Sequence, residues 1–571
     1  MPDLGRQDTV LVTGGGRGIG FAIAEELARR TGCRVVVTGR AAPPGDEPWQ
    51  ALDEKAFARW SREELRAAAG KDAVRDTRRR LSRAAQQREV HGNLRRAAAA
   101  GLRLEYQRCD CTDPEAVRDL LERIGEPPTV LIHNAGTDQS RRFADQSPHE
   151  VADTVAVKVD GLLTVVDAVR TRPGARLRLV SGVGSLAGRV GGMVGQVAYS
   201  AGNDALARLG HWISAELGIP AQTTVWHTWA GRSGLANLRT AVRYTSLVDP
   251  GEGVDHWARE ILSGAAGEVL FMGRYGNAVL PHQLSNRMPL VYDADHPRWA
   301  SARHYLGELR SYRIHGDIEC VNRLRTGDHP CFGEYTVDGH PALPVSVLLE
   351  YAISLGDWVT PHGWPPLRLR EVTGVDVRLG SLAFRDGELR LRKRGHGAER
   401  RDGSWTVTVD LARDDDGTPV LSADLVYGEE PAEVPPPRAR SGPPRQPAAA
   451  ATGSSRHRWS RHLFRAPVRR AAAGGGEEFA LRPVEGADLW SLPYAPATRI
   501  DPAALETLAR TAITARGDSA ERLRIARLVP GPGATRLPVL RSSADGADWL
   551  GTTGEGTPAL LAEGVAAGPL T

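Results

Sequence analysis

A glycine-rich turn, TGGGRGIG at residues 13–20, is the feature that most constrains the fold of this chain. It follows a short apolar segment of β-forming residues, DTVLV, and precedes a segment with helical periodicity, FAIAEELARR. A second apolar segment, CRVVVTGR, ends at residue 40, so residues 8–40 predict a βαβ unit. Glycines allow a tight turn, and the N-terminus of the following helix favours an anion. The start of the chain therefore predicts an α/β domain that binds a phosphate group at this turn.

The length and composition fit a large enzyme better than a nucleic-acid-binding or membrane protein. The chain has 571 residues, enough for two to four domains, and a formal net charge of only +4. No apolar run reaches about 18 residues, and the N-terminus lacks the regions of a secretory signal. The five cysteines are few and odd in number, which is typical of a reduced chain. We therefore expect a cytoplasmic protein with no nucleic-acid partner, no membrane span and no metal.

The first part of the chain alternates strands and helices, with one interruption. Residues 41–100 open with a Pro-rich turn, APPGDEP, and continue as a charged, Ala- and Arg-rich sequence, which predicts a helical insertion. Strands resume at LRLEYQRCDCTD, PPTVLIHNAG and RLRLVSG. We expect this first domain to cover residues 1–295, followed by a linker at residues 296–307.

The second part of the chain has a different character. Over residues 308–430 an apolar helical segment, VSVLLEYAISLGDW, precedes several strands separated by Asp and Gly turns, which predicts an α+β domain. Residues 431–457 are rich in Pro, Ala and Arg and predict a linker. Residues 458–571 repeat the order of elements, with a helix at PAALETLARTAITAR before further strands. Two such blocks suggest a duplicated unit.

Four polar residues downstream of the glycine turn form a second pattern: Lys158, Ser185, Tyr199 and Asn203. Tyr199 and Asn203 are four residues apart and share one face of a helix. The chain resembles the short-chain dehydrogenases/reductases, in which the residue four after the catalytic tyrosine is usually lysine. An asparagine there, with a lysine upstream in AVKVDGLL, resembles the ketoreductases of polyketide and fatty-acid synthases. Only four of the 73 basic residues are lysines, so Lys158 is informative.

The resemblance implies a role for each of these residues. Tyr199 would donate a proton to a substrate carbonyl while a hydride reaches the carbon. A free tyrosine has a pKa of about 10, and we expect the Lys158 ammonium to move the pKa of Tyr199 toward the working pH. Ser185 would hydrogen-bond the carbonyl, and Asn203 would support the network. Ser185 lies fourteen residues before Tyr199, where the family has thirteen, but the segment GSLAGR favours Ser185 over Ser181.

The resemblance also implies a dinucleotide cofactor. Arg40 ends the second predicted strand, where a carboxylate would bind a ribose hydroxyl and an arginine suits a 2′-phosphate. We therefore expect NADPH, with an ordinary surface arginine as the alternative interpretation of Arg40. The residues expected to contact the cofactor lie in the glycine turn, at Arg40, and in the CDCTD and NAG segments: Thr13, Gly14, Gly16, Arg17, Gly18, Ile19, Gly20, Arg40, Asp110, Asn134, Ala135 and Gly136.

Two further features narrow the resemblance. The Pro-containing insertion after the second strand and the phrase WHTWAG resemble ketoreductases of polyunsaturated-fatty-acid and enediyne polyketide synthases. Residues 308–571 resemble the double hot-dog dehydratase that follows the ketoreductase in those synthases. Gly339 and Pro344 match the spacing of its first motif, but Tyr335 stands in place of the catalytic histidine and His340 follows the glycine.

The second hot dog also departs from the family pattern. Glu506 takes the place of the catalytic aspartate, with Arg510 four residues later, and Asp501 is either an alternative acid or a helix cap. A neutral phenol such as that of Tyr335 is a poor base at pH 7. We expect this half to be inactive as a dehydratase and to bind acyl chains or partners. A repurposed site that uses Tyr335, His340 or Glu506 is the alternative.

Together these features predict an α/β Rossmann N-terminal domain followed by an α+β double hot-dog region. The predicted activity is NADPH-dependent reduction of a β-ketoacyl thioester carried by a separate acyl carrier protein, beside other polyketide synthase components. We expect a homodimer. The alternatives are a bifunctional ketoreductase/dehydratase with a non-standard dehydratase site and a reductase of a free ketone that dimerises through its C-terminal half. A scaffold without chemistry is disfavoured by the intact set of catalytic residues.

Overall fold

The structure is a computed structural model of the chain, and it divides into two compact units. The first comprises residues 1–236 with 247–273, and the second residues 237–246 with 274–571. The residues that the structure describes are 4–42, 45, 47–138, 140–191, 195–231, 246–271, 304–361, 366–400, 402–435, 455–460, 462–464, 467–472, 476–492 and 496–570. The predicted domain end at residue 295, and most of the predicted linkers 296–307 and 431–457, lie outside these residues.

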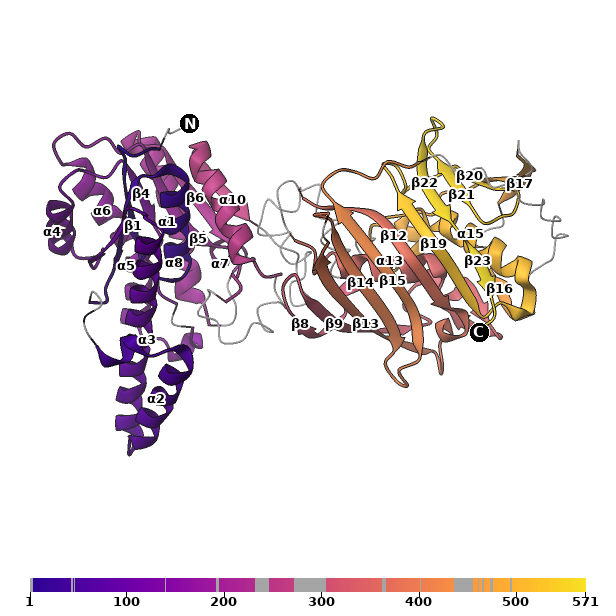
Figure 1. Cartoon of the computed structure of the whole chain (residues 1–571), viewed down its shortest axis with the longest axis horizontal. Helices are drawn as coiled ribbons and strands as arrows, with labels where there is room; N and C mark the ends of the chain where they lie inside the picture. Colours follow the sequence, from indigo (N-terminus) through magenta and orange to yellow (C-terminus); the bar gives the residue numbers. More distant parts are fainter. Residues whose placement is uncertain are drawn as a thin grey trace. The chain divides into compact units, whose positions relative to one another are not determined.

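A seven-stranded parallel sheet forms the centre of the first unit (Figure 1). Its order is β3-β2-β1-β4-β5-β6-β7. The strands are β1 (Thr9–Thr13), β2 (Arg34–Gly39), β3 (Leu104–Arg108), β4 (Val130–His133), β5 (Leu179–Ser185), β6 (Ala221–Trp226) and β7 (Gly267–Phe271). The order reverses between β1 and β4, and doubly wound sheets bind ligands at such a switch point, beyond the carboxyl ends of the strands. The predicted Rossmann fold of the N-terminal part is confirmed.

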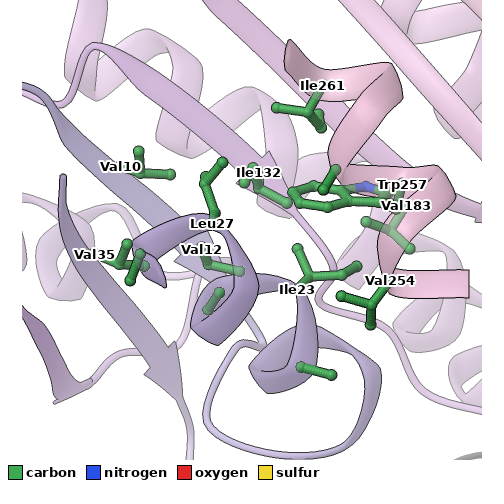
Figure 2. Close-up of a cluster of buried hydrophobic side chains, with 14 of the residues drawn as sticks. Val10, Val12, Ile23, Leu27, Val35, Ile132, Val183, Val254, Trp257 and Ile261 are labelled. Carbon is green, nitrogen blue, oxygen red and sulfur yellow. The ribbon is translucent and has the colours of Figure 1, made fainter. Parts of the chain in front are cut away.

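Helices cover both faces of this sheet, which is why the central strands β1 and β4 are buried at every position. In β1, Val10 and Val12 belong to the buried cluster on one face, and Leu11 belongs to the cluster on the other. Figure 2 shows the first cluster, in which Ile23 and Trp257 lie over the strand valines. The helices are α1 (Gly18–Thr31), α4 (Pro114–Ile124), α5 (Pro148–Lys158), α6 (Asp160–Arg170), α7 (Ala187–Val190), α8 (Val197–Leu217) and α10 (Pro250–Ser263), with a short η2 (Phe143–Asp145).

The insertion predicted at residues 41–100 is helical. It contains η1 (Pro48–Ala51), α2 (Glu54–Ala67) and α3 (Lys71–Ala99). The amphipathic α2 buries no residue completely, and α2 and the start of α3 extend away from the sheet in Figure 1. The second half of α3 contacts the sheet near β3 and buries Val90, Asn93 and Ala97. The insertion is therefore anchored to the first unit by one end of α3.

An antiparallel sheet of thirteen strands dominates the second unit. The order is β17-β18-β20-β21-β22-β19-β12-β15-β14-β13-β9-β8, with β23 paired to β19. The pairing of β12 with β19, from Val372 with Leu528 to Arg378 with Arg522, joins the two halves. The strands are β8 (Glu308–Tyr312), β9 (Asp317–Arg325), β12 (Arg368–Arg378), β13 (Glu388–Glu399), β14 (Trp405–Arg413), β15 (Pro419–Gly428), β17 (Val468–Ala471), β18 (Glu477–Ala480), β19 (Arg522–Pro530), β20 (Val539–Ser542), β21 (Trp549–Thr552), β22 (Pro558–Glu563) and β23 (Ala566–Gly568).

Each half of this sheet contacts one long helix. α13 (Val345–Gly356) is buried along its whole length against β13, β14 and β15, and α15 (Pro502–Arg516) contacts β19, β23 and α13. A separate three-stranded sheet has the order β11-β10-β16, with β10 (Tyr335–Val337), β11 (His340–Ala342) and β16 (His457–Trp459). The short helices are η4 (Pro330–Gly333), η5 (Leu379–Leu382), α14 (Gly486–Leu489) and η6 (Gly517–Ser519). The second unit thus has the predicted α+β character, and its assignment as a double hot dog stays a prediction.

No helix in the described part of the chain is both long enough and apolar enough to cross a lipid bilayer.

Candidate active site

The glycine turn between β1 and α1 contacts the turn that follows β4. Gly14 has a φ of +64°, and a Cβ there would lie 2.8 Å from the Cα of Ala135. Asn134 donates from Nδ2 to the carbonyl oxygen of Gly14 at 2.9 Å, and a Cβ on Gly20 would collide with the same amide. Two segments predicted to bind the cofactor therefore lie side by side at the carboxyl ends of β1 and β4.

Other predicted cofactor residues surround this turn. Arg17 is the N-cap residue of α1, but its exposed side chain makes no capping hydrogen bond. Ile19 is half-buried in the first turn of α1. Gly16 lies under Tyr106 of β3, because a Cβ on Gly16 would approach the tyrosine ring to 2.6 Å. Only glycine therefore fits at this position without moving the ring.

Arg40 and Asp110 follow the neighbouring strands β2 and β3. Arg40 is exposed, and it makes no ion pair with any described residue. Asp110 accepts hydrogen bonds at Oδ1 from the backbone N–H and the hydroxyl of Thr112, at 3.1 and 2.8 Å. Asp110 thus holds the local turn, while the Arg40 guanidinium remains available to an anionic ligand.

Tyr199 on α8 and Ser185 at the end of β5 lie together. The side chain of Tyr199 is partly buried, and desolvation raises the pKa of its phenol, while hydrogen bonding with Ser185 and Asn203 opposes that rise. Asn203 donates from Nδ2 to the carbonyl oxygen of Tyr199 at 2.8 Å, and its Oδ1 is buried without a partner among the described residues. Ser181 is fully buried inside β5, away from its end. The structure therefore places Ser185, rather than Ser181, beside the tyrosine.

Lys158 lies at the end of α5, buried beside β5. Burial lowers the pKa of Lys158 to about 8. Its Nζ donates to the carbonyl oxygen of Val183 at 2.7 Å, and a Cβ on Gly136 would lie 2.8 Å from its Cε. The pKa of Tyr199 is raised rather than lowered, and Lys158 is not among the groups that act on it. In this structure the Lys158 ammonium is held by a β5 carbonyl, and its action on Tyr199 stays a prediction.

The sequence analysis missed His133, the last residue of β4. Its Nε2 donates to the carbonyl oxygen of Val157 at 3.1 Å, so its Nδ1 accepts the hydroxyl proton of Thr13 at 2.9 Å. Thr13 in turn accepts from the backbone N–H of Ala135 at 3.4 Å. Burial and the neighbouring Lys158 lower the pKa of His133 to about 3, so the ring is neutral. A histidine directly before the NAG segment was the available signal.

His227, in the WHTWAG segment just after β6, was also missed. Burial lowers the pKa of His227 to about 4. Both ring nitrogens are buried without a partner among the described residues, which exclude residues 232–245. Trp226, which precedes it, pairs with Ser185 across β5 and β6, so His227 follows directly on the Ser185 side of the sheet.

A pocket opens beside Tyr199. Arg141 and Glu150 form an ion pair at 2.8 Å in its wall, and Gln196 donates to Asp138 at 2.7 Å. The described lining residues are Asp138, Arg141, Gln146, Glu150, Thr154, Gly195, Ala198 and Tyr199. A substrate carbonyl that enters this pocket can reach a phenol that is protonated at neutral pH.

The second unit brings together two of its predicted site residues, Tyr335 and Glu506, from positions 171 residues apart in the sequence. Trp459 of β16 lies between them. Its ring centroid is 4.8 Å from that of Tyr335, and its Nε1 donates to Oε1 of Glu506 at 2.9 Å. Burial raises the pKa of Tyr335 well above its usual value, and the Glu506 carboxylate acts in the same direction. The sequence analysis predicted that Tyr335 and Glu506 belong to one site, and the structure places them close together.

A histidine that the sequence analysis missed joins this cluster. The hydroxyl of Tyr335 donates to Nδ1 of His457 at 2.8 Å, because Nε2 of His457 donates to the carbonyl oxygen of Ala520 at 2.7 Å. The other oxygen of Glu506 accepts from the backbone N–H of Ser346, in the first turn of α13, at 3.1 Å. Tyr335, His457 and Glu506 are each at most 1% exposed. Tyr335 is closed off, and the polar atoms of Tyr335, His457 and Glu506 have hydrogen-bond partners.

The other two predicted residues of this half lie outside the cluster. Asp501 is the N-cap of α15, where it accepts from Ala503 and Ala504, and it also accepts from Leu537 at 2.7 Å. Of the two roles predicted for Asp501, alternative acid or helix cap, the structure shows the helix cap. His340 is exposed next to the turn between β10 and β11. A small opening reaches Glu506 but is not lined by Tyr335; its described lining residues are Leu463, Phe464, Pro467, Leu481, Arg482, Ala503, Glu506, Thr507 and Arg510.

Comparison with known proteins identifies the first unit. Residues 8–231 match the family model of the KR domain. The chain is 27% identical over 282 residues, 47% of its length, to a polyunsaturated fatty acid synthase of Thraustochytrium sp., and covers 10% of that protein. It is 29% identical over 265 residues, 45% of its length, to polyketide synthase GfsA of Streptomyces halstedii, and covers 3% of that protein. The chain thus spans a tenth or less of these relatives.

Solved structures match about half of the chain. A ketoreductase domain from the bacillaene assembly line is 23% identical with a TM-score of 0.36, over 50% of this chain and 60% of that one. A ketoreductase from the first module of phoslactomycin biosynthesis in Streptomyces sp. HK803 is 22% identical with a TM-score of 0.36, over 51% and 57%. The match of residues 8–231 to the KR model supports the resemblance to the ketoreductases for this part of the chain.

Proposed function

We propose that the chain reduces a β-ketoacyl thioester to the β-hydroxyacyl thioester with NADPH, in biosynthesis of the polyketide or fatty-acid type. The observation that carries the proposal is the contact of Tyr199 with Ser185 at a pocket, within a KR domain. Burial keeps the phenol of Tyr199 protonated, so it can act as the acid for a carbonyl oxygen.

The residues present fit a dinucleotide. At Gly14, Gly20 and Gly136 a Cβ would have no room, so the two turns pack closely together at the carboxyl ends of β1 and β4, where this fold binds a dinucleotide. The unpartnered Oδ1 of Asn203 is a further acceptor that a ligand can satisfy. The glycine turn and the N-terminus of α1 would hold the diphosphate, and Arg40 the 2′-phosphate.

When bound, the cofactor supplies the hydride to the β-carbon. Ser185 donates a hydrogen bond to the carbonyl oxygen and orients it. Tyr199 gives its proton to the same oxygen as negative charge develops there, and the phenolate then recovers a proton from solvent in the pocket. The buried chain from Ala135 through Thr13 to His133 fixes the ends of β1 and β4, which keeps the two cofactor turns in register.

For the second unit we propose a dehydratase-like double hot dog with a structural or acyl-binding role. Two half-sheets, each with a long helix, meet at β12 and β19, which supports a duplicated unit. The closed Tyr335 cluster offers a substrate no access to the phenol, which supports loss of dehydration. The second candidate, a repurposed site, is favoured by the hydrogen bond between Tyr335 and His457 and by the opening at Glu506.

The proposed partners follow from the proposed substrate. A separate acyl carrier protein would present the thioester, other polyketide synthase components would make and use it, and the chain would act as a cytoplasmic homodimer. Reduction of a free ketone, with the second unit used for dimerisation, is the competing function.

One assay tests the proposal. Purified protein is incubated with NADPH and a β-ketoacyl thioester, on a carrier protein and as a small-molecule thioester, and NADPH oxidation is followed by absorbance. Mass spectrometry then distinguishes hydroxyacyl from enoyl product. We expect hydroxyacyl product, made faster from the carrier-bound substrate than from the free β-keto acid. Turnover of the free acid alone would overturn the proposal in favour of the free ketone, and enoyl product would establish the repurposed site.

A further inference from the structure

The helical insertion reaches the glycine turn, and its contact there is not explained by anchoring alone. The backbone N–H of Gly18, the first residue of α1, donates to Oε1 of Glu89 on α3 at 2.9 Å. The N-cap residue, Arg17, makes no side-chain capping bond. A carboxylate from a helix 71 residues further along the chain therefore supplies the cap at this end of α1.

The same stretch of α3 is held firmly against the turn. Asn93, one turn after Glu89, is buried and donates from Nδ2 to the carbonyl oxygen of Gly16 at 3.2 Å. Val90 is buried, and a Cβ on Gly16 would lie 3.4 Å from its side chain. Arg96 makes two hydrogen bonds to Glu25 of α1, at 3.1 and 3.2 Å. Glu89 is therefore positioned by contacts on both sides of the turn.

The position of Glu89 matters because the start of α1 is where this fold places a cofactor diphosphate. The first backbone N–H groups of a helix carry partial positive charge and favour an anion. A carboxylate that accepts one of these N–H groups competes with a phosphate for the same donors and repels it. Glu89 thus occupies part of the region that an anionic cofactor needs.

We propose that the Glu89 side chain gates the cofactor site and lowers cofactor affinity by holding the anion position until the diphosphate displaces it. This inference rests on the proposed function. Anchoring through Asn93 and Arg96 needs no carboxylate at position 89, so removing its charge leaves the insertion in place. The affinity of the chain for a dinucleotide is thereby set by a residue outside the turn itself.

The test is direct binding, measured by isothermal titration calorimetry of NADPH into wild type, Glu89→Gln and Glu89→Ala. We expect both variants to bind NADPH about 5- to 20-fold more tightly than wild type, because the repelling charge is gone. Asp76→Asn is the matched control. It removes one negative charge from the same helix about 20 Å away along the axis, and its dissociation constant should equal that of wild type. Circular dichroism melting verifies that each variant is folded.

Hydrogen exchange gives a second readout on wild type. If NADPH displaces Glu89, exchange in the second half of α3 rises on binding, whereas a purely structural cap predicts unchanged or slower exchange there. Equal or weaker NADPH binding by both Glu89 variants than by wild type would overturn the inference alone. Absence of binding by folded wild type and all variants would overturn the proposed function, and the inference with it.

Discussion

The Tyr199 site and the Tyr335 cluster each contain a tyrosine with polar neighbours, but they differ in whether those neighbours have hydrogen-bond partners. Each contains a tyrosine that contacts a polar partner, Ser185 fourteen residues away in one case and His457, 122 residues away, in the other. Around Tyr199, Asn203 keeps an acceptor without a partner among the described residues, and a pocket opens beside the phenol. Around Tyr335, His457 donates onward to a carbonyl, and both Glu506 oxygens accept hydrogen bonds.

Unpaired polar atoms and access to the tyrosine distinguish a ligand-binding site from a structural cluster, even where both contain the same residue types. Buried polar groups are normally paired, so an unpaired one beside a pocket points to a ligand that completes it. A cluster that satisfies its own groups gains stability and excludes a substrate. By this criterion the Tyr199 phenol is accessible to a ligand and the Tyr335 phenol is not, and the opening in the second unit reaches only Glu506.

The largest expected effect is on reduction by Tyr199→Phe. This change removes the proton donor and keeps the ring, so kcat should fall by about 100-fold or more. Steady-state NADPH oxidation with a β-ketoacyl thioester measures it. Near-normal turnover by Tyr199→Phe would show that Tyr199 is not the proton donor for reduction.

Stability should depend on pH through Lys158. The pKa of Lys158 is about 8 in the folded protein against 10.5 for the free side chain. Between these values the unfolded chain binds the proton and the folded chain does not, so the free energy of unfolding rises with pH across this window. The rise should reach at most about 3 kcal/mol. Urea unfolding of the protein without added cofactor, from pH 7.5 to 10.5, should show it in wild type and not in Lys158→Met; parallel pH profiles would contradict the shift.

Cofactor choice should depend on Arg40. Loss of a charge-assisted contact costs roughly 1.5–3 kcal/mol, so Arg40→Ala should weaken NADPH binding by about 10- to 150-fold and leave NADH nearly unchanged. Titration calorimetry with both nucleotides measures the effect. Arg118→Ala, an exposed arginine on α4, is the control. Equal losses for both nucleotides would show that Arg40 does not bind the 2′-phosphate.

Glu506→Gln should destabilise the second unit without slowing reduction. The amide nitrogen cannot accept, so either the Ser346 N–H or the Trp459 N–H loses its partner, at a cost of about 1–3 kcal/mol. Differential scanning calorimetry should show a lower melting temperature, with unchanged NADPH turnover. Enoyl product from wild type that disappears in Glu506→Gln would make this cluster catalytic and erase the contrast between the units.

The smallest effect is expected for Tyr335→Phe. It leaves Nδ1 of His457 without its donor and should cost about 0.5–1.5 kcal/mol, again with unchanged reduction. Comparing its melting temperature and product spectrum with those of Glu506→Gln tests whether the two residues belong to one structural cluster. A fall in kcat for reduction would show that the phenol has a role in the first unit's chemistry.

The fold of the first unit was predictable because its signals are local. The valines of β1 and β2, the glycine turn and the helical period of α1 are all read within residues 8–40, and the observed elements follow them. Tyr199 and Asn203 were predictable for the same reason, since spacing on one helix sets their relation. The helical insertion was likewise evident from its composition.

Residues that depend on distant contacts were not predictable in this way. His133 and His457 matter because of hydrogen bonds to Thr13 and Tyr335, which lie 120 and 122 residues away in the sequence. The hydrogen bond from Lys158 to the carbonyl of Val183 has the same origin, because the two residues meet only when α5 packs on β5. The contact of Glu89 with Gly18 depends on how the helical insertion packs against the glycine turn, and sequence periodicity does not show that packing.

The sequence by itself determined the βαβ start, the α+β character of the C-terminal part and the residue types available for chemistry. Hydrophobic periodicity and backbone preferences act over a few residues, and they suffice for elements and turns. Only the tertiary structure decided which polar groups are satisfied, because hydrogen-bond partners are brought together by packing of segments far apart in the chain. That is why one tyrosine faces a pocket with an unpaired acceptor nearby, and the other is closed by a histidine, a tryptophan and a helix end.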